Sequence, residues 1–253
     1  MRVRATVSYD GGPFHGFAVN EGVRTVAGDL DATLSRVIGT PVVVTCAGRT
    51  DRGVHAVGQV VSFDAPDDTD LGRVRRSVNS LCRPSVVLRS LERSDDDFDA
   101  RFTATGRSYR YQVLNRQDPD PFLAATAWHV TVPLDVDAMQ SAADHLVGEH
   151  DFTSFCRRRK VAPGAVEVNL VRRIETVAWR GPDDAGLLEF AITAKSFCHQ
   201  MVRSIVGTLV EVGQGKRPAE GIPAVLAARA RHAAASPAPP HGLVLWSVRY
   251  PDA

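Results

Sequence analysis

Residues 46–63 read CAGRTDRGVHAVGQVVSF, and no other stretch of the chain is as informative about its fold. The run PVVVTCAG at 41–48 is nearly continuous in apolar residues and predicts a short strand. The run VGQVVSF at 57–63 predicts a second strand. The segment between these two strands is polar, and such loops on a rigid framework are where catalytic groups concentrate.

This loop carries a carboxylate between two cations, since Asp51 lies between Arg49 and Arg52. Nearby positive charge favours the ionised form of a carboxyl group. An ionised and oriented carboxylate can act as a nucleophile toward a sugar or a base. Gly48 and Gly53 flank the group and allow backbone conformations that a side chain would forbid. An Asp–Arg pair that only stabilises the loop would explain the same residues, so both hypotheses stand at this point.

The rest of the chain alternates between helical and strand patterns. Apolar spacing predicts helices over 25–37, 71–81, 135–147, 197–213 and 219–232, and further strands over 2–9, 85–92, 98–115, 171–181, 187–194 and 243–250. Strands that follow one another through short loops pair antiparallel, which indicates the α+β class. We therefore expect two α+β halves of the RRM/ferredoxin-like kind, residues 1–100 and 101–253. They are expected to join in a continuous, mostly antiparallel sheet with a central cleft.

Composition sets broader limits on the function of this chain of 253 residues. Its 44% hydrophobic and 23% charged residues are ordinary for a globular enzyme. No apolar run approaches the roughly 18–20 residues that cross a bilayer. The N-terminus lacks the apolar core of a signal peptide, so we expect a cytoplasmic protein without a membrane partner. The net charge of +1 does not indicate whether the partner is a polyanion, because nucleic-acid enzymes need only a local basic surface. One such basic cluster spans residues 157–160.

The four cysteines are scattered and form no CxxC pair. This spacing argues against a zinc ribbon and against a dithiol redox site. We expect small buried thiols, while the even number leaves a disulfide open.

The loop GRTDRGVHA at 48–56 resembles the signature of the tRNA pseudouridine synthase A family, usually written GRTDxGVHA. The resemblance extends through nearly the whole chain. Further matching segments, in the family's order, are YDGGPFHGF (9–17), VNSL (78–81), FDARFTATGRSYRY (98–111), GEHDFTSF (148–155) and FCHQMVRSIVGTLVEVG (197–213). Several separate motifs in one order make a chance match very improbable.

The resemblance implies a reaction in tRNA. The enzyme would detach a uridine base from its ribose, turn it over and rejoin it through carbon 5. Asp51 takes the place of the family's aspartate, which forms a covalent adduct. Attack on C1′, attack on the base and a glycal intermediate all remain open. Because the reaction balances internally, no cofactor, metal or activated phosphate is expected.

The resemblance also assigns roles to residues distant from the loop. Tyr109 matches the tyrosine that packs on the uracil of a flipped-out nucleotide, although core packing would also explain a strand tyrosine. Arg203 matches the arginine that pairs with the nucleophilic carboxylate. A helix over 197–213 would place His199 on the same face as Arg203, four residues later. Arg49 matches the residue that occupies the space left by the flipped base.

Other motif residues are candidates for substrate binding. His55 suits either loop organisation or RNA contact, and Asn79 and Arg101 suit RNA contact or pocket structure. A metal site is not expected, because no HExxH pattern occurs. Four stretches depart from the family's pattern, and they include Leu81–Pro84 and Asp99, which replaces a frequent histidine. Phe17 and Ala18 stand where the family commonly has Trp-Gln, which suggests that an RNA-facing contact is lost or replaced, and residues 164–173 lack a common Thr-Ile-Arg run.

The family modifies uridines 38, 39 and 40 of the anticodon stem-loop and suggests a homodimer with tRNA as the partner. Two rival functions remain. A non-catalytic RNA-binding protein of the sheet-platform type would use Tyr109 and Tyr111 to stack bases. A retaining glycosidase would also use an Asp nucleophile, but it normally needs a second carboxylate as acid.

Overall fold

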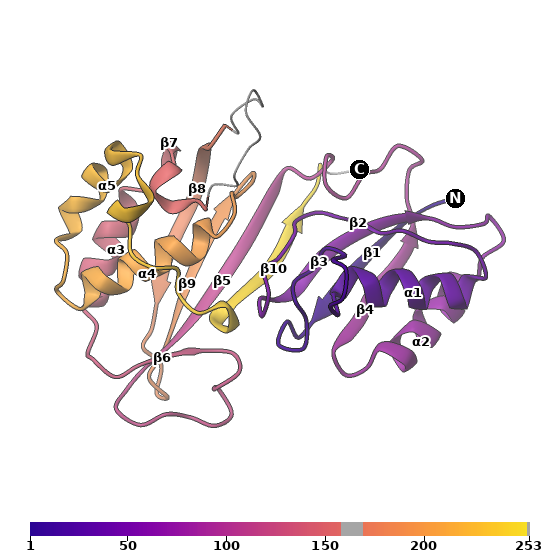
Figure 1. Ribbon diagram of the computed structural model, residues 1–253, viewed down its shortest axis with the longest axis horizontal. Coiled ribbons are helices and arrows are strands. Elements are labelled where there is room, and N and C mark those ends of the chain that lie inside the picture. Colours follow the sequence, from indigo (N-terminus) through magenta and orange to yellow (C-terminus); the bar gives the residue numbers. More distant parts are fainter. Residues whose placement is uncertain (158–168, 252–253) are drawn as a thin grey trace. The chain divides into compact units, whose positions relative to one another are not determined.

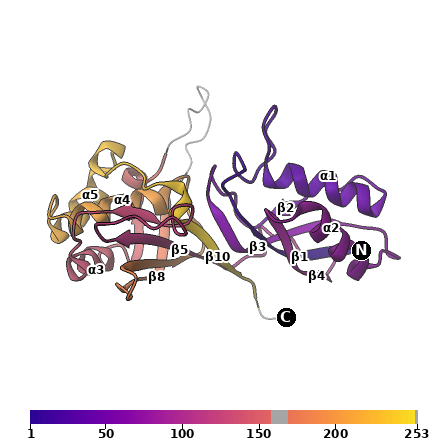
Figure 2. The same cartoon turned by 90° about the horizontal axis from the view of Figure 1, so that it is seen from below.

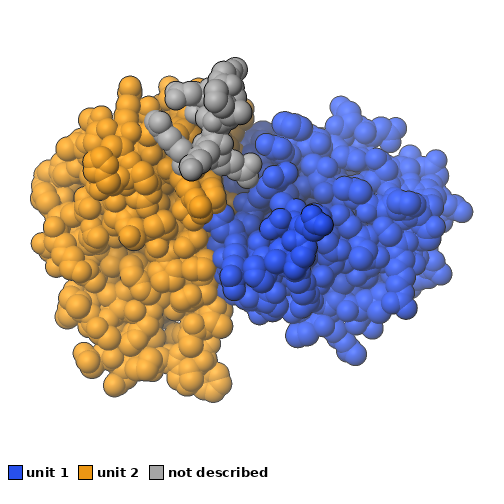
Figure 3. Space-filling model, viewed as in Figure 1, with its two compact units in different colours: residues 1–107, 244–253 blue, residues 108–243 orange. Residues whose placement is uncertain are grey.

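The computed structural model describes residues 1–157 and 169–251, and Figure 1 draws its elements along the chain. The chain divides into two compact units, coloured separately in Figure 3. Unit 1 comprises Met1–Arg107 together with Val244–Ala253, and unit 2 comprises Ser108–Leu243. The C-terminal strand therefore belongs with the N-terminal residues, an association that the order of elements along the sequence does not reveal.

Unit 1 is a sheet with two helices. Its elements are β1 (Arg2–Tyr9), α1 (Val26–Ile38), β2 (Thr45–Cys46), β3 (His55–Asp64), α2 (Leu71–Cys82), β4 (Val86–Arg93) and most of β10 (Leu243–Arg249). The strand order is β4-β1-β3-β10, with β2 paired to β3. β1 pairs antiparallel with β3 and with β4, whereas β10 runs parallel to β3. Every second residue of β1 is buried, because α1 and α2 cover one face of these strands (Figure 2).

Side chains at the helix ends explain where α1 and α2 begin. Thr25 Oγ1 accepts a hydrogen bond from Gly28 N at 3.2 Å, and Asp70 Oδ1 accepts one from Arg73 N at 2.9 Å. These bonds satisfy backbone donors that have no partner within the helix. Gly39 ends α1 in the left-handed conformation, with a φ of 89°.

Unit 2 contains the remaining strands and the helices that cover them. Its elements are most of β5 (Gly106–Asn115), β6 (Trp128–Val130), α3 (Val136–Asp144), β7 (Gly148–Asp151), the 3₁₀ helix η1 (Thr153–Phe155), β8 (Val171–Arg180), β9 (Leu187–Ala194), α4 (Met201–Gly213) and α5 (Ile222–Ala228). The strand order is β5-β9-β8-β7, and β6 runs parallel to β5. α3 packs against α4 and against β8. The α+β class with mostly antiparallel pairing is confirmed, while the central cleft stays a prediction.

Two predicted strands are wrong over part of their length, and both errors have the same cause. Residues 41–44 are not a strand, because the N–H groups of Val42 and Val44 bond to Ser35 Oγ at 2.8 Å and Asp31 Oδ1 at 2.8 Å. Residues 98–105 form a turn before β5. In this turn the Asp99 carboxylate accepts hydrogen bonds from the backbone N–H groups of Arg101 and Phe102. In each case a side chain takes donors that a strand partner would otherwise use.

Three predicted helices are shorter than expected, and the one predicted over 135–147 is observed as Val136–Asp144. α4 begins at Met201 rather than at residue 197, because Gln200 adopts a left-handed φ of 63°. The predicted helix over 219–232 reduces to α5, with short 3₁₀ turns on either side. The strands β6 and β7 were not predicted, and both are only three or four residues long.

Candidate active site

The loop that contains Asp51 joins β2 to β3 in unit 1. Asp51 is half-buried, whereas Arg49 and Arg52 are exposed. The Asp51 carbonyl accepts a hydrogen bond from Val54 N at 3.1 Å. Gly53 lies inside this turn with a φ of 77°, which side chains rarely adopt. The loop thus turns sharply at the residue expected to react.

The loop packs closely on the turn that follows β1. A Cβ added at Gly11 would lie 2.1 Å from the Val54 carbonyl oxygen, so only glycine allows this approach. The Phe17 N–H donates to the Thr50 carbonyl at 3.1 Å. Phe17 is 1% exposed, and its ring packs on Tyr9 at 6.0 Å between centroids. The ring of Phe17 is therefore part of the core beneath the loop, and the loss or replacement of an RNA contact at Phe17 and Ala18 stays a prediction.

A buried polar network holds the other side of the loop. The Tyr9 hydroxyl and Thr50 Oγ1 are hydrogen-bonded at 2.8 Å. Gln59 is fully buried and forms two hydrogen bonds with the backbone of Gly48. Its amide donates to the Gly48 carbonyl at 2.6 Å and accepts from the Gly48 N–H at 3.3 Å. Satisfied buried networks of this kind specify one conformation, because any broken bond leaves an unsolvated polar atom.

Arg107 connects the start of the loop to the turn before β5. Its side chain is buried, and Nη2 donates to the Ala47 carbonyl at 2.8 Å and to the Arg101 carbonyl at 2.8 Å. Burial raises the pKa of the neighbouring Cys46 thiol to about 11, in spite of the opposing charge of Arg49. This thiol is therefore protonated at neutral pH and no candidate nucleophile.

His55 and Asn79, two predicted substrate-binding residues in unit 1, contact other residues of the protein itself. His55 is 8% exposed, and its Nδ1 lies 3.1 Å from both Gly11 N and Asp10 Oδ1. Asn79 on α2 bonds to both backbone groups of Leu88 in β4, at 3.1 and 2.7 Å. These contacts favour loop organisation by His55 and helix-to-strand anchoring by Asn79 over direct contact with RNA. Arg101 is exposed.

In unit 2, Tyr109 lies on β5 and is 8% exposed. Its ring meets Phe197 edge to face, with 5.1 Å between centroids. Tyr111, two residues along the same face, is fully buried and donates to the Pro239 carbonyl at 2.8 Å. Burial raises the pKa of Tyr111 far above its ordinary value, and the charge of Arg203 opposes that rise. Tyr111 and Arg203 bind the carbonyls of two adjacent residues, Pro239 and Ala238 respectively.

Arg203 is fixed on the first turn of α4. Its Nε donates to the Ala238 carbonyl at 2.7 Å, while its own carbonyl accepts from Ala238 N at 2.9 Å. Gly207 allows α4 to approach the segment that contains Ser236 and Ala238, because a Cβ at Gly207 would lie 2.2 Å from the Ser236 carbonyl oxygen. The predicted helical pairing of Arg203 with His199 is wrong. His199 precedes α4, is exposed, and accepts from Arg157 N at 2.9 Å through its carbonyl.

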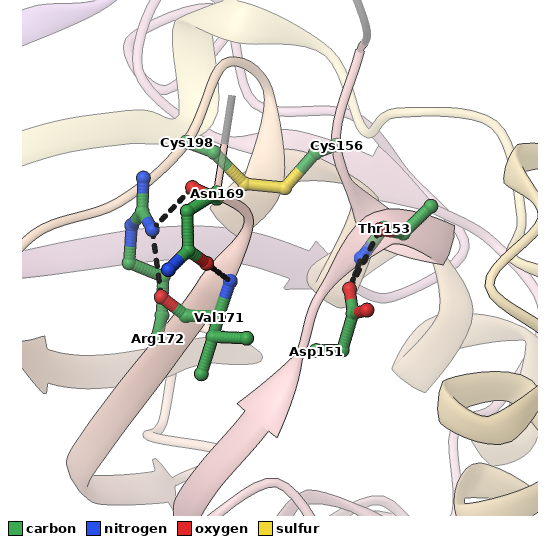
Figure 4. The surroundings of a disulfide bond; sticks show 7 residues. All are labelled: Asp151, Thr153, Cys156, Asn169, Val171, Arg172 and Cys198. Carbon is green, nitrogen blue, oxygen red and sulfur yellow. Dashed lines mark hydrogen bonds between the residues drawn. A yellow bond between two sulfur atoms is a disulfide. The ribbon is translucent and has the colours of Figure 1, made fainter. Parts of the chain in front are cut away.

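Cys156 and Cys198 are joined by a disulfide (Figure 4), so the expectation of four separate thiols is wrong for this pair. The bond connects the residue after η1 to the segment before α4, with 5.8 Å between the Cα atoms. Their separation of 42 residues explains why sequence spacing did not show their proximity. Nearby, Asp151 accepts hydrogen bonds from Thr153 N at 3.0 Å and Thr153 Oγ1 at 2.6 Å.

Some predicted features lie outside the described residues. These are most of the basic cluster at 157–160 and the first part of the departure at 164–173. Over residues 1–157 and 169–251, no group of three or more His, Cys, Asp or Glu side chains is placed to hold a metal ion. Within the same ranges, no helix is both long and apolar enough to cross a membrane.

Comparison with known proteins decides the family. A family model described as tRNA pseudouridine synthase matches residues 142–251. A protein of Frankia casuarinae called tRNA pseudouridine synthase A is 44% identical over 99% of this chain and 90% of its own length. Its counterpart in Bacillus velezensis is 42% identical over 99% of both chains.

The chain belongs to the tRNA pseudouridine synthase A family. Membership confirms the resemblance of the motifs and makes the protein a pseudouridine synthase, which is an isomerase. Among solved structures, an archaeal box H/ACA sRNP Nop10-Cbf5 complex is similar with a TM-score of 0.38 and 12% identity, over 82% of this chain and 44% of that chain. A likeness this distant supports no conclusion about the synthase.

Sequence reasoning missed the residues that hold the synthase's loop in place. Gln59, Tyr9 and Arg107 act through buried hydrogen bonds to the loop or its flanks. The one available signal was a glutamine inside an otherwise apolar strand pattern at 57–63, because a buried amide requires nearby partners.

Proposed function

We propose that this synthase isomerises uridine in the anticodon stem-loop of tRNA, at positions 38, 39 and 40, with Asp51 as the nucleophile. The proposal takes its substrate and positions from the family, and its nucleophile from the GRTDRGVHA loop. The observation that carries it is the half-buried Asp51 on a turn held by Thr50, Gly48 and the glycines that pack beneath it. Such a constrained carboxylate loses little freedom when it reacts.

The bonds of the reaction balance without another reactant. The bond from N1 to C1′ of the ribose breaks, the base turns over, and a bond from C5 to C1′ forms. C5 loses a proton and N1 gains one. Asp51 forms and then releases the covalent adduct, so the carboxylate is regenerated.

The other assigned residues prepare the nucleotide. A stacked base is out of reach of a carboxylate, so the target uridine is flipped out at a cost of a few kcal/mol. In the proposal Tyr109 packs on its ring and assists loss of the C5 proton, while Arg49 fills the vacated space. Arg203 pairs with the Asp51 carboxylate, and its Nε bond to Ala238 supports this role by restricting the guanidinium. His199 and Arg101 are assigned to tRNA contact because both are exposed.

The sheet-platform alternative is less well supported. It needs a pair of exposed aromatic rings on the strand, but Tyr111, the second ring of the pair, is 0% exposed. We further propose that the synthase works in the cytoplasm as a homodimer, which would double the basic surface available to one tRNA.

The test is tritium release from C5-labelled anticodon stem-loop transcripts. We expect Asp51→Ala and Asp51→Asn to lower the rate by at least about a thousandfold, because the nucleophile is lost. Asp68→Ala, which removes an exposed carboxylate, is the matched control and should leave the rate unchanged. Release at the wild-type rate from Asp51→Ala would refute the assignment. Free uracil as the product would favour the glycosidase alternative.

A further inference from the structure

The turn at 98–105 presents an aromatic ring to solvent. Phe102 is 79% exposed, although exposing so large an apolar side chain is unfavourable. The Arg101 guanidinium lies over this ring, 5.2 Å from its centroid. A cation and an aromatic face therefore lie together on the surface of unit 1.

The turn is held by its own hydrogen bonds. Asp99 Oδ1 accepts from the N–H groups of Arg101 at 2.7 Å and Phe102 at 2.8 Å. Asp99 and Thr103 exchange two more bonds, one to the Thr103 hydroxyl at 3.1 Å and one to the Asp99 carbonyl at 3.0 Å. The Tyr250 hydroxyl donates to the Ala100 carbonyl at 2.7 Å. The exposed ring is thus carried by a turn of defined shape.

The same turn is tied to the loop that contains Asp51. Through its Nη2 atom, the buried Arg107 binds the carbonyl of Arg101 and the carbonyl of Ala47, each at 2.8 Å. Ala47 immediately precedes the GRTDRGVHA loop. A single guanidinium therefore sets the turn and the loop in one arrangement within unit 1.

We propose that Phe102 and Arg101 form a stacking platform for an unpaired nucleotide of the tRNA substrate, separate from the uridine that reacts. The inference deepens the proposed function and rests on it. A base packs on the open face of Phe102, and the Arg101 cation reaches the adjoining phosphate. Aromatic stacking with a nearby cation is how proteins hold unpaired bases without choosing a sequence. The adjacent cation favours a polyanion over a second copy of this chain as the occupant.

The test measures binding of a fluorescently labelled anticodon stem-loop transcript over a range of salt concentrations. All variants carry Asp51→Ala, so that the transcript is not converted during the measurement. We expect Phe102→Ala to raise Kd about tenfold with an unchanged salt slope, because stacking is lost and no charge is removed. Phe102→Tyr, which keeps an aromatic ring, should leave Kd within about twofold of the value for the Asp51→Ala parent. Arg101→Gln should reduce the salt slope by about one, as expected for one lost phosphate contact.

The control is Phe122→Ala, which removes a ring that is 93% exposed in unit 2. It should leave Kd unchanged. In the enzyme with Asp51 intact, Phe102→Ala should raise KM and preserve kcat. The platform is refuted if Phe102→Ala binds within twofold of the parent, or if sedimentation shows that it dissociates a dimer. Failure of the proposed function would differ, since no variant with Asp51 would then release tritium.

Discussion

At the scale of single residues, the catalytic loop depends on side chains that do not react. Gln59 shows this most clearly, because its buried amide satisfies both backbone groups of Gly48, three residues before Asp51. We expect Gln59→Leu to leave these groups unpaired and to cost about 2–4 kcal/mol of stability, with a lower kcat from a misplaced carboxylate. Val57→Ala, at an exposed position on the same strand, should change stability by no more than about 0.5 kcal/mol. Urea denaturation and tritium release measure the two effects, and equal stability losses in both variants would contradict the assigned role.

At the scale of elements, the approach of the β1 turn to the catalytic loop depends on one glycine. A Cβ at Gly11 would meet the Val54 carbonyl at 2.1 Å, whereas a Cβ at the adjacent Gly12 would meet only the Asp10 carboxylate, at 3.2 Å. We expect Gly11→Ala to push the two segments apart, with a loss of about 1–3 kcal/mol and a marked fall in kcat. Gly12→Ala is the matched control and should be nearly neutral, because the Asp10 side chain can move. Thermal melts and initial rates check this, and equal behaviour of the two variants would show that the close contact is unimportant.

At the scale of the whole molecule, the C-terminal strand belongs to the unit formed by the N-terminal residues. β10 pairs with β3 through Val244 opposite His55 and Leu245 opposite Ala56, and Leu245 is fully buried. The Tyr250 ring packs on Phe98 with 5.0 Å between centroids. We therefore predict that residues 1–107 alone do not unfold cooperatively, because Leu245 and the pairing of β3 are missing.

The matched comparison replaces residues 108–242 by a flexible linker, which keeps β10 with unit 1. This chain should show a cooperative thermal transition by circular dichroism. A cooperative transition of equal midpoint in residues 1–107 would show that unit 1 does not require its last strand.

The sequence by itself determined the α+β class, the positions of α1, α2 and β3, and the membership of the family. These depend on local periodicity, on capping residues such as Thr25 and Asp70, and on motifs read in order, all of which are properties of neighbouring residues. Only the tertiary structure showed that residues 41–44 bond to α1, that Gln59 and Arg107 hold the loop, and that Cys156 meets Cys198. Each of these contacts joins two different segments of the chain, with separations that range from 7 to 60 residues. Hydrophobic spacing shows that a group is buried, but which partner satisfies it is decided when the chain folds.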